Sequence, residues 1–137
     1  MLIRAYARYR RLADSREDGQ RAKDNRPWDL VLLGDGPLKA DICRLISDFR
    51  LHGHVHLRGF IQYRELPAYY ALADAFVHAS TTEQWGLVVN EAMATGLPVI
   101  VSNRCGCVPD LVAEGKNGFT FDPGSVESLA KLMLESK

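Results

Sequence analysis

Two spacings of apolar residues alternate along the chain and predict strands and helices in repeated succession. Short apolar runs ended by glycine or polar residues are typical of strands, and apolar residues three or four positions apart indicate amphipathic helices. The chain opens on such a helix, with Leu2, Tyr6, Tyr9 and Leu12 on one face, and residues 14–27 form a polar connection. Strands are expected at 29–33, 54–58, 74–78, 98–101 and 118–121, and further helices at 38–49, 66–72, 85–95, 109–114 and 125–136.

The order of these elements predicts the fold class. Strands that alternate with helices and are apolar along nearly their whole length are typical of a parallel sheet buried on both faces. We therefore expect a doubly wound, Rossmann-like α/β fold with a mostly parallel sheet and helices on both faces. A length of 137 residues with 47% apolar content suits one folding unit.

Composition adds little that would recruit a charged partner. Lysine plus arginine and aspartate plus glutamate number 17 each, so the net charge favours neither nucleic acid nor an anionic membrane. No apolar run approaches the roughly 20 residues that cross a bilayer, and no leader pattern follows Met1. The odd set Cys43, Cys105 and Cys107 indicates a reducing compartment. We expect a cytoplasmic location, with peripheral contact at the inner membrane left open.

The turn after the third expected strand carries the strongest functional signal. Ligands of such sheets bind at the carboxyl ends of the strands, and here Glu83 and Glu91 lie across a strand-to-helix turn with seven residues between them. With Glu91 about two turns into the helix, the two residues would lie roughly 9–12 Å apart. The first amides of the helix, beside Trp85 and Gly86, favour a pyrophosphate, and carboxylates accept hydrogen bonds from vicinal hydroxyls. This spacing suits a sugar nucleotide.

A structural interpretation of the same residues stays open. Ser80-x-x-Glu83 also matches a capping box, in which a serine and a glutamate satisfy the first amides of a helix. Glu91 would then be a solvated helix residue.

The stretch from Ser80 to Ile100 resembles the paired-glutamate motif of a large glycosyltransferase family. These are the retaining glycosyltransferases of two-domain GT-B architecture, called family 4 or glycosyl transferases group 1. Four further landmarks of that family occur in the family's order, and together they cover nearly the whole chain. They are Gly34-Asp35-Gly36-Pro37 and the segments 55–60, 73–77 and 117–123.

The resemblance implies a role for each motif residue. Glu83 would contact hydroxyls of the donor sugar at the catalytic site, and Glu91 would bind the nucleotide ribose. The donor is a nucleoside-diphosphate sugar, of the UDP or GDP class, and the acceptor is a glycan, a lipid or a small molecule. No cofactor and no metal are implied, because helix amides and cationic side chains stabilise the departing diphosphate. The backbone of Gln84, Trp85, Gly86 and Leu87 would approach the diphosphate and sugar, Gly59, Phe60 and Ile61 the base, and Gly34 and Gly36 would leave room for the nucleotide.

The chain also departs from the family pattern. Family members begin this domain with a central strand and a loop whose arginine and lysine grip the phosphates, followed by a helix that resembles residues 2–11. This sequence begins at that helix, so the phosphate-gripping arginine and lysine and the acceptor-binding domain are expected to be missing from it. Residues 1–137 are therefore expected to be a single donor-binding domain, inactive without its partner domain. A missing central strand predicts exposed sheet edges, weak stability or a neighbouring chain in the gap.

Histidines and cysteines offer weaker candidates. His52, His54 and His56 alternate, so on a strand their imidazoles would share one side as in a metal site, but no acidic or cysteine partner stands at a fixed spacing. An exposed loop and strand face is the favoured interpretation. Cys105-Gly106-Cys107 lacks the spacing of a redox or zinc pair and is interpreted as a turn near the donor pocket.

Other charged positions have plain interpretations. Arg4, Arg8 and Arg11 form a basic stripe, which is usually a solvated helix face and only seldom a lipid contact. His78 precedes the glutamate turn, where a buried or capping role is favoured over general-base catalysis.

Three competing functions remain for comparison. An epimerase or phosphorylase of the same architecture would act on its donor without a separate acceptor. A scaffold module would bind no nucleotide. A nicotinamide dehydrogenase is disfavoured, because the turn at Gly34 lacks the third glycine of the dinucleotide fingerprint and no acidic residue stands at the expected strand end.

Overall fold

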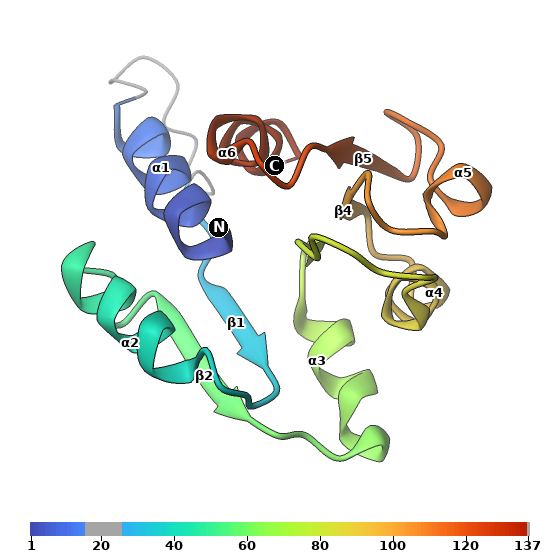
Figure 1. The fold of residues 1–137 in the computed structure, drawn as a ribbon. Coiled ribbons are helices and arrows are strands. Elements are labelled where there is room, and N and C mark those ends of the chain that lie inside the picture. Colours follow the sequence, from blue (N-terminus) through green and yellow to red (C-terminus); the bar gives the residue numbers. More distant parts are fainter. Residues whose placement is uncertain (16–25, 137) are drawn as a thin grey trace.

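The computed structural model describes residues 1–15 and 26–136 (Figure 1). The expected polar connection lies largely in 16–25, outside the described residues. The helices are α1 (Leu2–Asp14), α2 (Lys39–Asp48), α3 (Leu66–Leu72), α4 (Leu87–Ala94), α5 (Val108–Leu111) and α6 (Val126–Glu135), with a short 3-10 turn η1 (Tyr63–Glu65). The strands are β1 (Leu30–Leu33), β2 (Val55–Gly59), β3 (Phe76–His78), β4 (Val99–Ser102) and β5 (Gly118–Phe121).

All strand pairs are parallel, but the sheet is divided. β1 pairs with β2, and β4 lies between β3 and β5. Among the described strands no pairing joins the two half-sheets, and in Figure 1 they lie apart. Within the described residues β1 and β3 therefore each have an unpaired edge, which confirms the expectation of exposed sheet edges.

Helices cover both faces of the three-stranded half. Every residue of β4 is buried, and its side chains alternate between two clusters. Ile100 joins a cluster built mainly from α1 and α6, whereas Val99 and Val101 join a cluster with α4. Since successive side chains of a strand point to opposite faces, these clusters lie on opposite sides of the sheet. The Rossmann-like, doubly wound α/β fold is confirmed.

Helix α1 links the two half-sheets. It packs along α6 and also contacts α2, so the cluster that contains its buried face extends from β2 to β5 (Figure 1). Two tyrosines anchor it to the chain before β1: the hydroxyl of Tyr6 donates to the carbonyl of Trp28 (2.7 Å), and the hydroxyl of Tyr9 accepts from the amide of Trp28 (2.8 Å). Packing of helices, and not strand pairing, holds the two halves together.

The outer side of β1 and β2 remains open. Leu30 and Leu32 pack into the cluster under α1, but Val31, Leu33 and Leu57 are 47%, 38% and 37% exposed. This apolar strip belongs to the same half-sheet as the unpaired edge of β1.

Candidate functional site

The candidate residues lie at the carboxyl ends of the strands. Gly34 and Gly36 follow β1, and Gly59, Phe60 and Ile61 end or follow β2. The glutamate loop, which we define as residues 80–86, follows β3 and leads into α4. The cysteine turn, defined as residues 102–107, follows β4. The structure thus places the candidates where ligands of parallel sheets bind, with Gln84, Trp85 and Leu87 exposed along the glutamate loop and the start of α4.

The ends of β1 and β2 are joined through glycine backbone. The amide of Gly34 donates to the carbonyl of Gly59 at 2.7 Å, and both residues have positive φ angles, 115° and 69°. Residues with a side chain rarely adopt these angles, so both positions require glycine and no side chain covers the turn. Phe60 beyond it is 74% exposed. These features leave backbone and an aromatic ring accessible at this edge.

The charged side chain in the turn after β1 has its hydrogen-bond partners within that turn and at the start of α2. Asp35 accepts from Nζ of Lys39 at 2.9 Å and from the amide of Gly36 at 2.9 Å. The hydrogen bond from Lys39 lowers the pKa of Asp35, and the Gly36 amide adds to the effect. Asp35 is therefore a turn-forming residue that stays ionised.

The capping-box interpretation of the glutamate loop is wrong. The hydroxyl of Ser80 donates to the carbonyl of Thr82 at 2.9 Å, and the residue that caps α4 is Gly86. Glu83 lies outside the helix and forms an isolated parallel bridge with Cys105. Its side chain is 38% exposed, so a ligand can reach the carboxylate.

Helix α4 begins later than the apolar pattern predicts. Gly86 adopts φ 96°, ψ 61°, a left-handed conformation that breaks the helix before Leu87. Glu91 is therefore the fifth helical residue, a little more than one turn from the start and not two turns. The indole of Trp85 folds back to donate to Oδ1 of Asn90 at 2.9 Å. A helix start leaves its first amides without intrahelical acceptors, although here the amide of Val89 donates to the carbonyl of Gly86 at 2.9 Å.

Glu91 is held by a tyrosine from α3. The hydroxyl of Tyr70 donates to Oε2 of Glu91 at 3.1 Å, and the Tyr70 ring meets Phe76 edge-on at 5.9 Å. Burial and the Glu91 carboxylate raise the pKa of Tyr70 to about 12, so the hydroxyl remains a donor at neutral pH. Sequence spacing carried no signal for this contact between separate helices.

His78 faces Glu83. Its Nε2 is buried without a hydrogen-bond partner in the described part of the chain and lies 3.8 Å from Oε2 of Glu83. Burial lowers the pKa of His78 although Glu83 opposes the effect, so the ring is neutral at physiological pH. The burial of Nε2 agrees with the expectation for His78, but the sequence did not predict that the ring lies next to Glu83. The position of His78 at the carboxyl end of a strand, five residues before Glu83, was the available signal.

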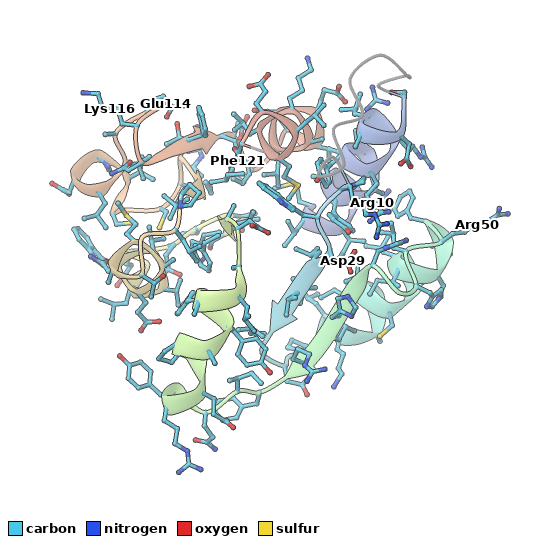
Figure 2. The ribbon with its side chains drawn as sticks, turned by 180° about the vertical axis from the view of Figure 1, so that it is seen from behind. Arg10, Asp29, Arg50, Glu114, Lys116 and Phe121 are labelled. Carbon is cyan, nitrogen blue, oxygen red and sulfur yellow. The ribbon has the colours of Figure 1, made fainter. Side chains whose placement is uncertain are left out.

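The three alternating histidines do not act together. His52 precedes β2 and contacts the hydroxyl of Ser47 (3.2 Å), whereas His54 and His56 each contact one oxygen of Asp29 at 3.1 Å. Nη1 of Arg10 lies 3.6 Å from the same carboxylate (Figure 2). This cluster lies at the amino end of β1, away from the candidate site. Across residues 1–15 and 26–136, no group of three or more histidines, cysteines or carboxylates could hold a metal ion.

The basic stripe of α1 is partly used inside the chain. Nε of Arg8 pairs with Glu127 of α6 at 2.9 Å, and the guanidinium of Arg4 lies 5.9 Å from the centre of the Phe49 ring. Among the described helices, none is long and apolar enough to span a bilayer.

Comparison with known proteins points to one family. The model of the family described as "Glycosyl transferases group 1" matches residues 2–136. The sulfoquinovosyl transferase SQD2 of Arabidopsis thaliana is 43% identical over 101 residues, which cover 72% of this chain and 19% of that protein. The alpha-monoglucosyldiacylglycerol synthase of Acholeplasma laidlawii is 39% identical over 105 residues, covering 76% and 25% of the two chains.

A solved structure shows the same fold. The crystal structure of Anabaena Alr3699/HepE in complex with UDP and glucose matches 98% of this chain and 34% of its own, with a TM-score of 0.75 and 27% identity. The chain spans between about a fifth and a third of the length of these proteins. Because the family match extends over nearly every residue and the fold agrees, this chain belongs to the glycosyl transferases group 1 family.

Proposed function

We propose that this chain is the donor-binding part of a retaining glycosyltransferase, which transfers a sugar from a nucleoside-diphosphate sugar to a glycan, lipid or small-molecule acceptor. A partner domain outside residues 1–137 presents the acceptor and completes the catalytic site. The enzyme works in the cytoplasm, without a cofactor or a bound metal. The three cysteines, all free, agree with a reducing compartment.

The observation that carries the proposal is the arrangement around the start of α4. Glu83 lies before the helix and Glu91 just over one turn into it, with Gly86 between them. Helix amides and the helix dipole favour a diphosphate, and each carboxylate can accept hydrogen bonds from a pair of hydroxyls. One ligand with a sugar at one end, a ribose at the other and a diphosphate between matches this order.

The comparisons support the ligand class. The Anabaena structure contains UDP and glucose, and the Arabidopsis relative is named a sugar transferase. The glutamates act by positioning the donor, and orientation alone contributes several kcal/mol in such reactions. Neither glutamate needs to act as a nucleophile.

Calorimetric titration of this chain with UDP, GDP and ADP tests the proposal. We expect one of the three to bind, and Glu91→Gln to weaken that binding about tenfold or more, because the amide replaces a charged acceptor of ribose hydroxyls. Addition of EDTA should not change the affinity.

Glu114→Gln is the matched control. Glu114 is exposed in the loop that precedes β5, at the amino end of that strand, and accepts hydrogen bonds from Thr120 of β5. This variant should bind as the wild type does. Binding of none of the nucleotides would favour the scaffold alternative, and unchanged affinity in Glu91→Gln would remove the ribose role.

A further inference from the structure

The cysteine turn contacts the glutamate loop along most of its length. The bridge between Glu83 and Cys105 aligns the two segments side by side. The thiol of Cys105 donates to the carbonyl of Trp85 at 2.8 Å, a side-chain bond added to a ladder of backbone bonds. These run from the Glu83 amide to the Arg104 carbonyl (3.3 Å), from the Gly106 amide to the Glu83 carbonyl (3.0 Å) and from the Cys107 amide to the Trp85 carbonyl (3.1 Å).

Two glycines allow this close approach. A Cβ at Gly106 would overlap the carbonyl oxygen of Gln84, and a Cβ at Gly86 would come within 2.6 Å of the Cys105 sulfur. Each segment therefore presents a bare backbone to the other. These contacts fix the position of the glutamate loop against the cysteine turn, and Cys105 lies at the centre of the contact.

The thiol pair is built for packing and hydrogen bonding. Cys105 and Cys107 are 2% and 0% exposed, and their sulfur atoms lie 3.5 Å apart. Burial, with the neighbouring Cys105, raises the pKa of Cys107 to about 11, so its thiol stays protonated at neutral pH. A reactive cysteine is instead a partly exposed thiolate. Both thiols are buried, which leaves an indirect role.

We propose that Cys105 is a positioning residue of the donor site: its thiol fixes the Trp85 carbonyl and thereby holds Glu83 in place for the sugar of the donor. This inference rests on the proposed function, because it assigns Cys105 to the sugar end of the same ligand. A purely structural role would weaken binding of the whole ligand, whereas this proposal predicts a loss of affinity confined to the sugar.

Hydrogen exchange of individual amides tests whether the Cys105 thiol fixes the glutamate loop. Cys105→Ala removes the donor and Cys105→Ser retains it. We expect the Gly106 and Cys107 amides to exchange about tenfold faster in Cys105→Ala, as loss of one hydrogen bond implies, and nearly as in the wild type in Cys105→Ser. Cys43→Ala, which changes an exposed thiol on α2, is the control. Equal exchange in all variants would overturn the proposal.

Paired titrations with UDP and UDP-glucose test the sugar end. Cys105→Ala should lose about tenfold of the affinity for UDP-glucose relative to UDP, with UDP itself bound as before, and Cys105→Ser should restore the ratio. If both ligands weaken equally, or if the ratio is unchanged, the inference is wrong while the proposed function stands. If the wild-type chain binds GDP or ADP instead of UDP, the pair is that nucleotide and its glucose ester; if it binds none of the three nucleotides, the proposed function itself fails.

Discussion

Single residues at the site show how burial sets chemistry. The buried Nε2 of His78 faces the Glu83 carboxylate at 3.8 Å, yet burial keeps the ring uncharged. A protonated ring there would stand next to a carboxylate that the proposed function needs for hydroxyl contacts. A neutral ring leaves Glu83 free to accept those hydrogen bonds.

His78 should make folding stability depend on pH. Because its folded pKa lies below the ordinary value of 6.5, the unfolded chain binds the proton more tightly. The stability that the neutral ring contributes is therefore present above pH 6.5 and is lost as the pH falls below it. Urea unfolding of the wild type should show this decline between about pH 7 and pH 5, and His78→Leu should flatten it.

His52→Gln is the matched control, because His52 is exposed in the turn before β2. A decline of the same size in His78→Leu and in the wild type would assign the pH dependence to other groups.

At this scale the sequence identifies candidates but not their partners. Glu83, Glu91 and the glycines were found from motif and spacing, and the structure places them at the carboxyl edge. The bond from Tyr70 to Glu91 joins residues 21 positions apart on separate helices, and the contact of Asp29 with His54 joins the residues that precede two neighbouring strands. Such contacts depend on how elements pack, which local patterns do not specify.

Among the elements, α1 has the widest structural role. Its tyrosines hold the backbone of Trp28 at the entrance to β1 while its other contacts lie on α6. Tyr9→Phe leaves the Trp28 amide without its acceptor, and an unsatisfied, partly buried group costs about 1–3 kcal/mol. We expect urea unfolding to show a loss of that order.

Tyr63→Phe serves for comparison, because Tyr63 is 75% exposed. Its unfolding midpoint should match that of the wild type. Equal midpoints for both variants would mean that water replaces the bond to Trp28.

Element positions follow from the apolar pattern more closely than element ends do. Strand β5 has the expected bounds, 118–121. The start of α4 moved from Trp85 to Leu87, because the left-handed conformation of Gly86 stops the helix, and a sequence shows a glycine but not its φ angle. A capping box does form, but at Gln62 and Glu65 before α3, where no cap was expected.

For the whole molecule, the divided sheet should be visible in amide exchange. The amide of Leu30 donates to the carbonyl of His54 in the β2 direction, so the next amide, Val31, points to the unpaired edge. We expect Val31 to exchange at least about tenfold faster than Leu32, and β4, paired on both sides, to exchange slowest.

Concentration provides the decisive comparison for this prediction. Protection of Val31 that rises with protein concentration would show another copy pairing with the edge, as expected for an exposed strand. Protection of Val31 equal to that of Leu32 in a dilute, monomeric sample would contradict the divided sheet.

The division also couples ligand binding to folding. Gly34 and Gly59 belong to one half-sheet, Glu83 and Glu91 to the other, and among the described residues the halves meet through one shared hydrophobic cluster and not through strand pairing. A ligand that touches both sets of residues would cross-link the halves without a covalent bond, and at a hundred times its dissociation constant it would add about 2.7 kcal/mol to stability. By the same reciprocity, a substitution that loosens α1 on α6 should weaken that ligand's affinity from a distance.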